Sequence, residues 1–241
     1  MATGSTMHTF DVQLADMDRG VYDDYSLRVA RHPSETDAYM LTRVLAYGLE
    51  FTEGIAFGGG ISQTDEPAVL VRDLTGKTTA WIEVGAPDAE RLHYGSRLAE
   101  RTVVYTHRDP AKVMAPWADK RIHRSEDLRV YSFDPGFIDS AAPLIARRNT
   151  MTLTVTEQVL YLDLNGTTLT TAIHEHQLGC AARSDGDHAL RRSDPTRQPF
   201  GVRDLLRRTR TRPHRASLYR RSAEQTTKAP PPRMRERGLR T

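Results

Sequence analysis

Two acidic residues in the middle of the chain are the strongest candidates for chemistry. Asp65 begins an Asp-Glu-Pro run just before an expected strand, and Glu83 lies near the end of the next strand, in a Trp-Ile-Glu-Val-Gly run. Carboxylates on neighbouring strands can converge on a hard cation such as Mg²⁺, which takes a few carboxylates and keeps water ligands. Such an ion can activate water and stabilise a phosphoryl transition state. The alternative is that Asp65 belongs to a turn and Glu83 forms a salt bridge at a sheet edge.

The apolar pattern around these acids predicts an α/β fold with a mixed sheet. A two-residue period predicts a hairpin of strands 7–17 and 22–30. Pro33, with Ser34 and Asp37 spaced as a capping box, predicts a helix over about 35–50 that Ser34 caps. The other expected elements are a glycine-rich loop at 51–64, strands at 69–72 and 80–84, helices at 87–100, 110–117 and 135–144, and strands at 102–106, 128–133, 150–156, 159–164 and 168–173.

Several runs of residues resemble the YaeQ family, in order, over residues 7–178. They are Arg-His-Pro-Ser-Glu-Thr at 31–36, Asp-Glu-Pro-Ala at 65–68, Trp-Ile-Glu-Val-Gly at 81–85, Pro-Asp-Ala-Glu-Arg-Leu-His at 87–93, Asn-Thr-Met-Thr-Leu-Thr-Val at 149–155 and Tyr-Leu-Asp-Leu at 161–164. The family is bacterial and similar in fold to the PD-(D/E)XK nucleases. The resemblance therefore implies a restriction-endonuclease-like mixed-sheet core with flanking β-hairpins, in a cytoplasmic protein.

The resemblance also implies a set of site residues. Asp65 matches the motif aspartate, Glu83 matches the acid on the following strand, and Glu35 matches an acid that this architecture supplies from its first helix. These three residues are the implied metal ligands, and the implied cofactor is Mg²⁺, with Mn²⁺ as a substitute. The implied catalytic set is Asp65, Glu83 and a basic residue, and nucleic acid is the implied substrate.

The basic residue departs from the family pattern. Gly85 stands where the motif would have its lysine, and relatives place basic residues on the next helix, at positions filled here by Tyr94 and Arg97. Arg97 is thus the candidate for binding phosphate, but an arginine stays protonated and cannot replace a lysine that accepts a proton. Two functions remain open: a Mg²⁺-dependent nuclease or phosphodiesterase, and a catalytically inactive relative that keeps the fold as a binding or interaction module.

Charge divides the chain into two parts. Residues 1–180 carry 17 Lys and Arg against 25 Asp and Glu, whereas residues 181–241 carry 17 against 6. An acidic body argues against a broad electrostatic surface for DNA. Only 7 of the 61 residues in 181–241 are Leu, Ile, Val or Phe, which is too few for a core, so a disordered basic tail is predicted. A nucleic-acid-binding arm and a shifted reading frame of GC-rich DNA are the alternatives for this segment.

Several other classes of protein are excluded by composition. No apolar run approaches the ~20 residues of a membrane-spanning helix, and the first seven residues lack the basic start and apolar stretch of a secretory signal. The single cysteine, Cys180, cannot form an internal disulfide or a cysteine-based zinc cluster, so a reducing cytoplasm is expected. His174 and His176 share one strand face but lack a third zinc ligand, so they are expected on an exposed terminal strand.

The boundary between body and tail gives a direct test. Limited proteolysis is expected to trim the protein to a core of about 7–178, because a chain without a buried core is open to cleavage. Mass spectrometry of the resistant fragment measures the boundary. A resistant fragment that extends past Arg215 would contradict it.

Overall fold

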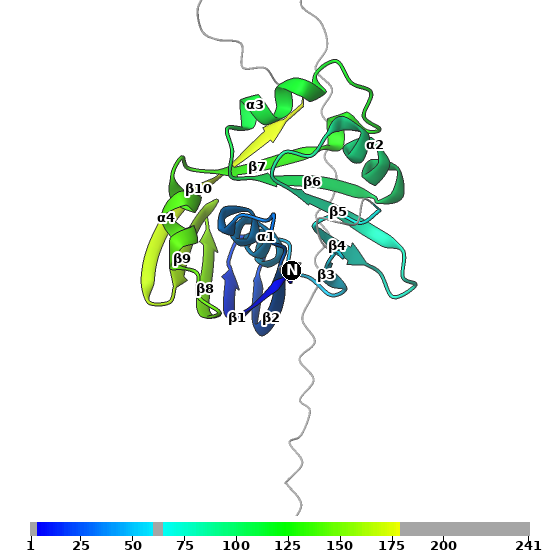
Figure 1. Cartoon of the computed structure of the whole chain (residues 1–241). Coiled ribbons are helices and arrows are strands. Elements are labelled where there is room, and N and C mark those ends of the chain that lie inside the picture. Colours follow the sequence, from blue (N-terminus) through cyan, green and yellow to red (C-terminus); the bar gives the residue numbers. More distant parts are fainter. Residues whose placement is uncertain (1–3, 60–64, 179–241) are drawn as a thin grey trace, which may run out of the picture. The chain divides into compact units, whose positions relative to one another are not determined.

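The computed structural model describes residues 4–59 and 65–178, which form a curled mixed sheet with helices on both faces (Figure 1). The strands are β1 (Thr6–Asp16), β2 (Val21–Arg31), β3 (Ile55–Phe57), β4 (Val69–Arg72), β5 (Thr78–Val84), β6 (Arg101–Thr106), β7 (Arg129–Phe133), β8 (Arg148–Thr156), β9 (Val159–Leu164) and β10 (Thr167–Gln177). The helices are α1 (Asp37–Leu49), α2 (Ala89–Leu98), α3 (Pro110–Met114) and α4 (Phe137–Ala141), with short 3₁₀ turns η1 (Ala115–Trp117), η2 (Ser125–Asp127) and η3 (Ala142–Leu144). The mixed α/β class expected from the sequence is confirmed.

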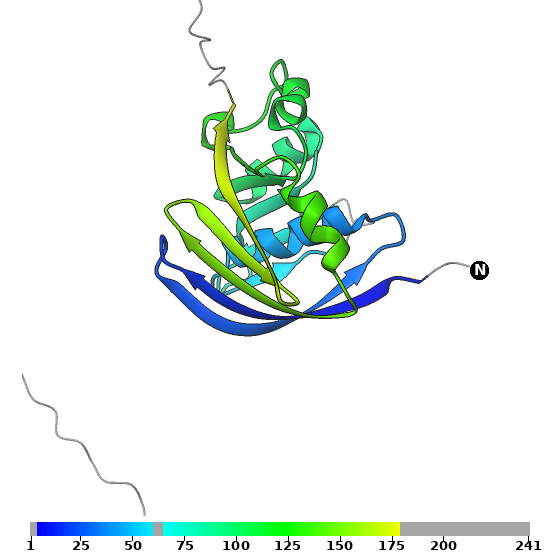
Figure 2. The ribbon, with the colours of Figure 1, turned by 90° about the vertical axis from the view of Figure 1, so that its left-hand side faces the viewer.

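The sheet is continuous because β10 changes its partner halfway along. Its described strands follow the order β2-β1-β8-β9-β10-β7-β6-β5-β4-β3. Residues 167–172 of β10 pair with β9, and residues 173–177 pair with β7. The β1–β8, β5–β6 and β6–β7 pairs are parallel, and the other pairs are antiparallel. The sheet bends around α1, and the long hairpin β1–β2 curves beneath it (Figure 2).

Helix α1 fills the concave side of the sheet and is buried almost all round. Its residues 40–46 are all buried, and α1 also contacts α4. Helices α2 and α3 cover the other face of β6 and β7, where Leu92, Val104, Trp117 and Val130 form a second cluster. A helix buried on nearly all sides is rich in apolar residues, as α1 is.

The start of α1 differs from the sequence expectation. Thr36 is the N-cap, and its hydroxyl oxygen accepts a hydrogen bond from the Tyr39 N–H at 3.1 Å. Ser34 was expected in this role, but its hydroxyl lies 2.6 Å from Nδ1 of His32 instead. The expectation of a Ser34 cap was therefore wrong, because Ser34 lies two residues before the N-cap position.

Two further expectations need comment. The expected loop at 51–64 contains strand β3, which pairs with β4, while residues 60–64 and their glycine lie outside the described part. The two histidines expected on an exposed strand lie on β10: His174 Nε2 is 2.7 Å from Asp134 Oδ1, and His176 Nε2 is 2.9 Å from the Ser132 hydroxyl.

The boundary before the predicted tail, and residues 181–241 themselves, lie outside the described part of the chain. None of the described helices has both the length and the apolar character that crossing a bilayer requires.

Two helical glycines, Gly95 and Gly48, lie close to other side chains, and we expect their replacement by alanine to have different effects on stability. In Gly95→Ala the new methyl group would lie 2.5 Å from ring atoms of Trp81, which is 2% exposed. Alanine gains about 1 kcal/mol of helix propensity over glycine, but forced overpacking costs about 1–3 kcal/mol. We expect Gly95→Ala to lower the free energy of unfolding by up to about 2 kcal/mol in urea denaturation.

Gly48→Ala is the matched control in α1. Its methyl group would meet Cδ1 of Leu153 at 2.5 Å, but this atom ends a flexible side chain that can rotate away. The loss of stability in Gly48→Ala is expected to be the smaller of the two. If Gly95→Ala proves as stable as wild type, α2 does not pack on Trp81 as closely as described.

Candidate functional site

Glu83 is a buried carboxylate on β5, with a residue exposure of 3%. Strand alternation places Trp81 and Glu83 on one face of β5, with Ile82 on the other. The indole N–H of Trp81 donates to Glu83 Oε1 at 2.7 Å. Nε of Arg91 lies 2.6 Å from the same oxygen. The acid expected from the sequence is therefore held in an enclosed ion pair and not at a solvated sheet edge.

Arg91 is the cation at this site, and it was not among the site residues predicted from the sequence. Asp88 caps α2 by accepting from the Arg91 N–H at 2.7 Å, which fixes Arg91 in the first helical turn. Its Nη2 also donates to the carbonyl oxygen of Glu66 at 2.5 Å, and its guanidinium carbon lies 6.0 Å from the Trp81 ring centre. A positive charge in the first turn of a helix interacts unfavourably with the helix dipole. The position of Arg91 in the sequence therefore indicated that its side chain has a specific negatively charged partner.

Glu35 forms a second buried ion pair, just before α1. Nη2 of Arg43 lies 2.8 Å from one carboxylate oxygen and donates to the other at 3.1 Å. The His32 N–H also donates to Glu35 Oε2 at 3.1 Å. Arg43 in turn donates to the Ala30 carbonyl at 3.0 Å and lies 5.4 Å from the centre of the Phe57 ring. This pair therefore ties the start of α1 to β2 and β3.

Tyr39 links the two acids electrostatically. Burial raises the pKa of its hydroxyl to about 12, and the charges of Glu83 and Glu35 add to the effect, while Arg43 and Arg91 oppose it. Gly85 lies against the same tyrosine, since a Cβ there would be 3.4 Å from the Tyr39 ring. The φ of Gly85 is +86°, a region that a lysine would occupy only with strain. The missing motif lysine thus corresponds to a position that this backbone reserves for glycine.

The other expected site residues, Asp65 and Arg97, are not buried as Glu83 is. Asp65 is exposed and adjoins the segment 60–64 that the structure does not describe. Arg97 is exposed near the end of α2, and the cation in contact with Glu83 is Arg91 instead. Tyr94 contacts the Trp81 ring edge-on, with 5.6 Å between centres. The roles predicted for Asp65 and Arg97 stay predictions.

The arrangement does not fit a divalent cation as it stands. Within residues 4–59 and 65–178, no group of three His, Cys, Asp or Glu side chains is placed to hold a metal ion. Burial raises the pKa of Glu35 and of Glu83, and the neighbouring arginines only partly oppose this. Each acid already has a guanidinium as its counter-charge, so a metal ion would have to displace an arginine before it could bind.

The raised pKa of Glu83 predicts how stability depends on pH. Burial lifts this pKa above its ordinary value of 4.5, so the folded protein keeps a proton that the unfolded chain has lost. The stability contributed by Glu83 is therefore present below about pH 4.5 and is lost as the pH rises through the folded-state pKa. The melting temperature of wild type relative to Glu83→Gln should fall between pH 4 and pH 7.

Glu90→Gln, an exposed acid on α2, is the control and should show no such trend relative to wild type. A difference between wild type and Glu83→Gln that grows with pH would mean that the Arg91 charge outweighs burial. Thermal unfolding by circular dichroism at constant ionic strength measures both differences.

Comparison with known proteins gives a consistent result. The family model described as YaeQ protein matches residues 1–173. The uncharacterized protein YaeQ of Escherichia coli strain K12 is 29% identical over 163 residues, which cover 67% of this chain and 90% of that protein. The corresponding protein of Salmonella typhi is 28% identical over the same length.

Two crystal structures have the same fold over the body of the chain. The YaeQ protein from Xanthomonas axonopodis pv. citri has a TM-score of 0.67 and 30% identity, covering 72% of this chain and 98% of that one. The YaeQ protein from Pseudomonas syringae has a TM-score of 0.65 and 30% identity, covering 71% and 95%. This chain therefore belongs to the YaeQ family.

Proposed function

We propose that this member of the YaeQ family is a non-catalytic binding or interaction module of nuclease-like fold. The observation that carries the proposal is the ion pair of 2.6 Å between Arg91 Nε and Glu83 Oε1. In a metal-dependent nuclease this acid would hold a divalent cation, whereas here an arginine of the same chain supplies the positive charge.

The nuclease-like part of the proposal is supported by the arrangement of elements around Glu83. Strands β3, β4 and β5 form an antiparallel meander that follows α1, and α2 then leads to β6, which is parallel to β5. This is a mixed sheet with one acid on a strand, as the family resemblance implies, whereas the acid expected on the first helix lies just before that helix. Glu83 and Glu35 occupy these two places.

The non-catalytic part is supported by the energetics of the two pairs. Removing one partner of a buried ion pair costs roughly 3–5 kcal/mol, because the remaining charge is left without compensation. A metal ion that displaced Arg91 would have to offset that cost and lose part of its own hydration. Gly85 fills the motif position of the lysine, and an arginine stays protonated, so it cannot take a proton from water.

The second candidate function, a divalent-metal-dependent nuclease or phosphodiesterase, has one observation in its favour. The Arg91 guanidinium contacts two hard oxygens at once, the Glu83 carboxylate and the Glu66 carbonyl. Oxygens of this kind are ligands that Mg²⁺ accepts. If Arg91 moved away, these two atoms would be free to bind a cation together.

A metal titration separates the two functions. Wild type is expected to show the same small melting-temperature change as Glu83→Gln when Mg²⁺ or Mn²⁺ is added to millimolar concentration, because a ligand stabilises only a state that binds it. Arg91→Ala should lower the melting temperature, while Arg97→Ala, on the exposed face of the same helix, should leave it nearly unchanged.

Cleavage assays complete the test, with single- and double-stranded DNA and RNA as substrates. No cleavage by wild type is expected with either metal. A Mn²⁺-dependent rise in the melting temperature of wild type that Glu83→Gln abolishes, together with metal-dependent cleavage, would overturn the proposal in favour of the nuclease.

A further inference from the structure

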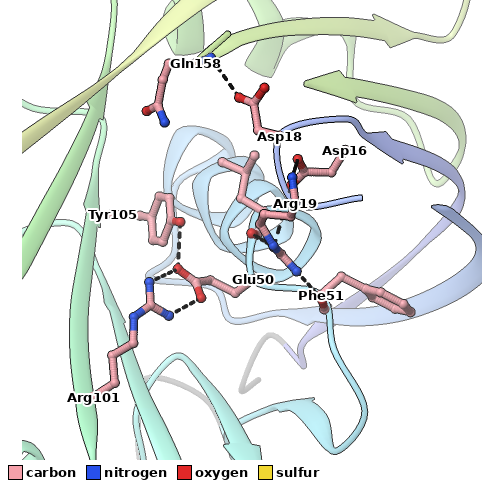
Figure 3. A network of polar contacts seen from close by, with 9 residues as sticks. Asp16, Asp18, Arg19, Glu50, Phe51, Arg101, Tyr105 and Gln158 are labelled. Atoms are coloured by element: carbon pink, nitrogen blue, oxygen red, sulfur yellow. Dashed lines mark hydrogen bonds and ion pairs between the residues drawn. The ribbon is translucent and has the colours of Figure 1, made fainter. Parts of the chain in front are cut away.

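A second polar site lies at the opposite end of α1 from Glu83. A half-open cavity of about 280 Å³ is lined there by the β1–β2 turn, the end of α1, β6, β7, the β8–β9 turn and β10 (Figure 3). Helix α1 has 13 residues, so its two ends are separated by about 20 Å at 1.5 Å per residue. Neither Glu35 nor Glu83 lines this cavity, and it is independent of the function proposed above.

Both arginines of the cavity are committed to partners in the protein. Arg101 forms a two-pronged ion pair with Glu50, which is 9% exposed, and the Tyr105 hydroxyl donates to the same carboxylate at 2.8 Å (Figure 3). Arg19 donates to the carbonyl oxygens of Leu49, the last residue of α1, and of Phe51, two residues beyond it. A helix leaves its last carbonyls without partners, so Arg19 is needed where it is. Each guanidinium of the lining therefore already has acceptors within the protein.

The β8–β9 turn is held over the cavity in an unusual conformation. Glu157 and Gln158 have φ of +52° and +62°, although each such non-glycine residue costs on the order of 1 kcal/mol. Asp18 offsets this cost by accepting both backbone N–H groups, at 2.7 and 2.8 Å. The Gln158 side chain extends from this turn toward Tyr105, and its amide has no hydrogen bond within the described residues (Figure 3).

Asp16 supplies a charge whose hydrogen bonding is incomplete. Its side chain is 3% exposed and lines the cavity. Oδ1 accepts from the Arg19 N–H at 3.0 Å, but Oδ2 lies 3.7 Å from Arg19 Nη1, which is beyond hydrogen-bonding distance. Oδ2 therefore accepts no hydrogen bond within the described residues, and a bound donor would supply one.

We infer that this cavity binds a small organic ammonium compound, a primary amine on a short apolar stem. An ammonium group has three donors and no acceptor, which matches the Asp16 carboxylate, the remaining lone pairs of Asp18 and the amide oxygen of Gln158. The faces of aromatic rings attract cations, and Tyr131, stacked 5.1 Å from Tyr105, forms one wall.

The size of the cavity and its apolar walls define the apolar stem of the proposed ligand. Leu49, Val155 and Ile173 provide apolar surface beside the polar end. The volume lies just below the range of about 300–1,000 Å³ that is typical of sites for drug-sized ligands, so the ligand is of small-metabolite size. The lining carries three carboxylates against two guanidiniums, which disfavours phosphates and carboxylates and favours a single positive charge.

A set of three probes of equal length tests the inference. The full chain is titrated at pH 7 and constant ionic strength with n-butylamine, n-butanol and butyrate, using isothermal calorimetry and thermal shift. Only n-butylamine should bind saturably and raise the melting temperature. Asp16→Asn, which keeps an oxygen for the Arg19 N–H but loses the charge, should weaken binding at least tenfold, and Gln158→Ala should weaken it several-fold.

Asp23→Asn removes an exposed acid from the neighbouring strand β2, and Glu83→Gln alters the other site, so both should bind n-butylamine as wild type does. The inference is overturned if n-butanol binds as well as n-butylamine, if no probe saturates, or if the variants bind like wild type. Should Asp16→Asn fail to fold, as judged by circular dichroism, the exposed Gln158→Ala decides the result.

Discussion

The burial of α1 inside the curled sheet is the constraint on which the rest of the structure depends. A helix enclosed on all sides has no water to satisfy its ends, and each unsatisfied buried group would cost about 1–3 kcal/mol. The Thr36 hydroxyl accepts a hydrogen bond from the first turn of α1. Arg19, in the β1–β2 turn, donates to the carbonyl oxygens at and just after the end of the helix. Both sites lie at these ends, because there the enclosing sheet has to bring polar groups inward.

Three buried acids are each paired with an arginine, and this repetition has a physical reason. Glu35 pairs with Arg43, Glu83 with Arg91 and Glu50 with Arg101. The planar guanidinium can contact two oxygens at once while its remaining donors bind carbonyls, as Arg43 and Arg91 do. Such pairs add little net stability, but each is lost if its elements shift, so they fix the positions of α1, α2 and β6 relative to the strands.

Local patterns in the sequence predicted much of the fold, and long-range pairings account for most of what was missed. The β1–β2 hairpin and helix α2 follow from short-range periodicity and from the signals at Pro87 and Asp88. The change of partner along β10 depends on β7 and β9, which no local pattern connects. The site was partly predictable: Glu83 was identified from the strand pattern and Glu35 through the family resemblance, whereas Arg91 could be recognised only once α2 was packed against β5.

The position of β10 as the last described strand has a consequence for how the chain folds during synthesis. β7 and β9 each pair with part of β10, and β1 pairs in parallel with β8, about 140 residues further along the chain. Contacts between residues far apart in sequence form slowly. The sheet cannot close around α1 until β10 has left the ribosome, so the nascent chain exposes the apolar surface of α1 for most of its translation.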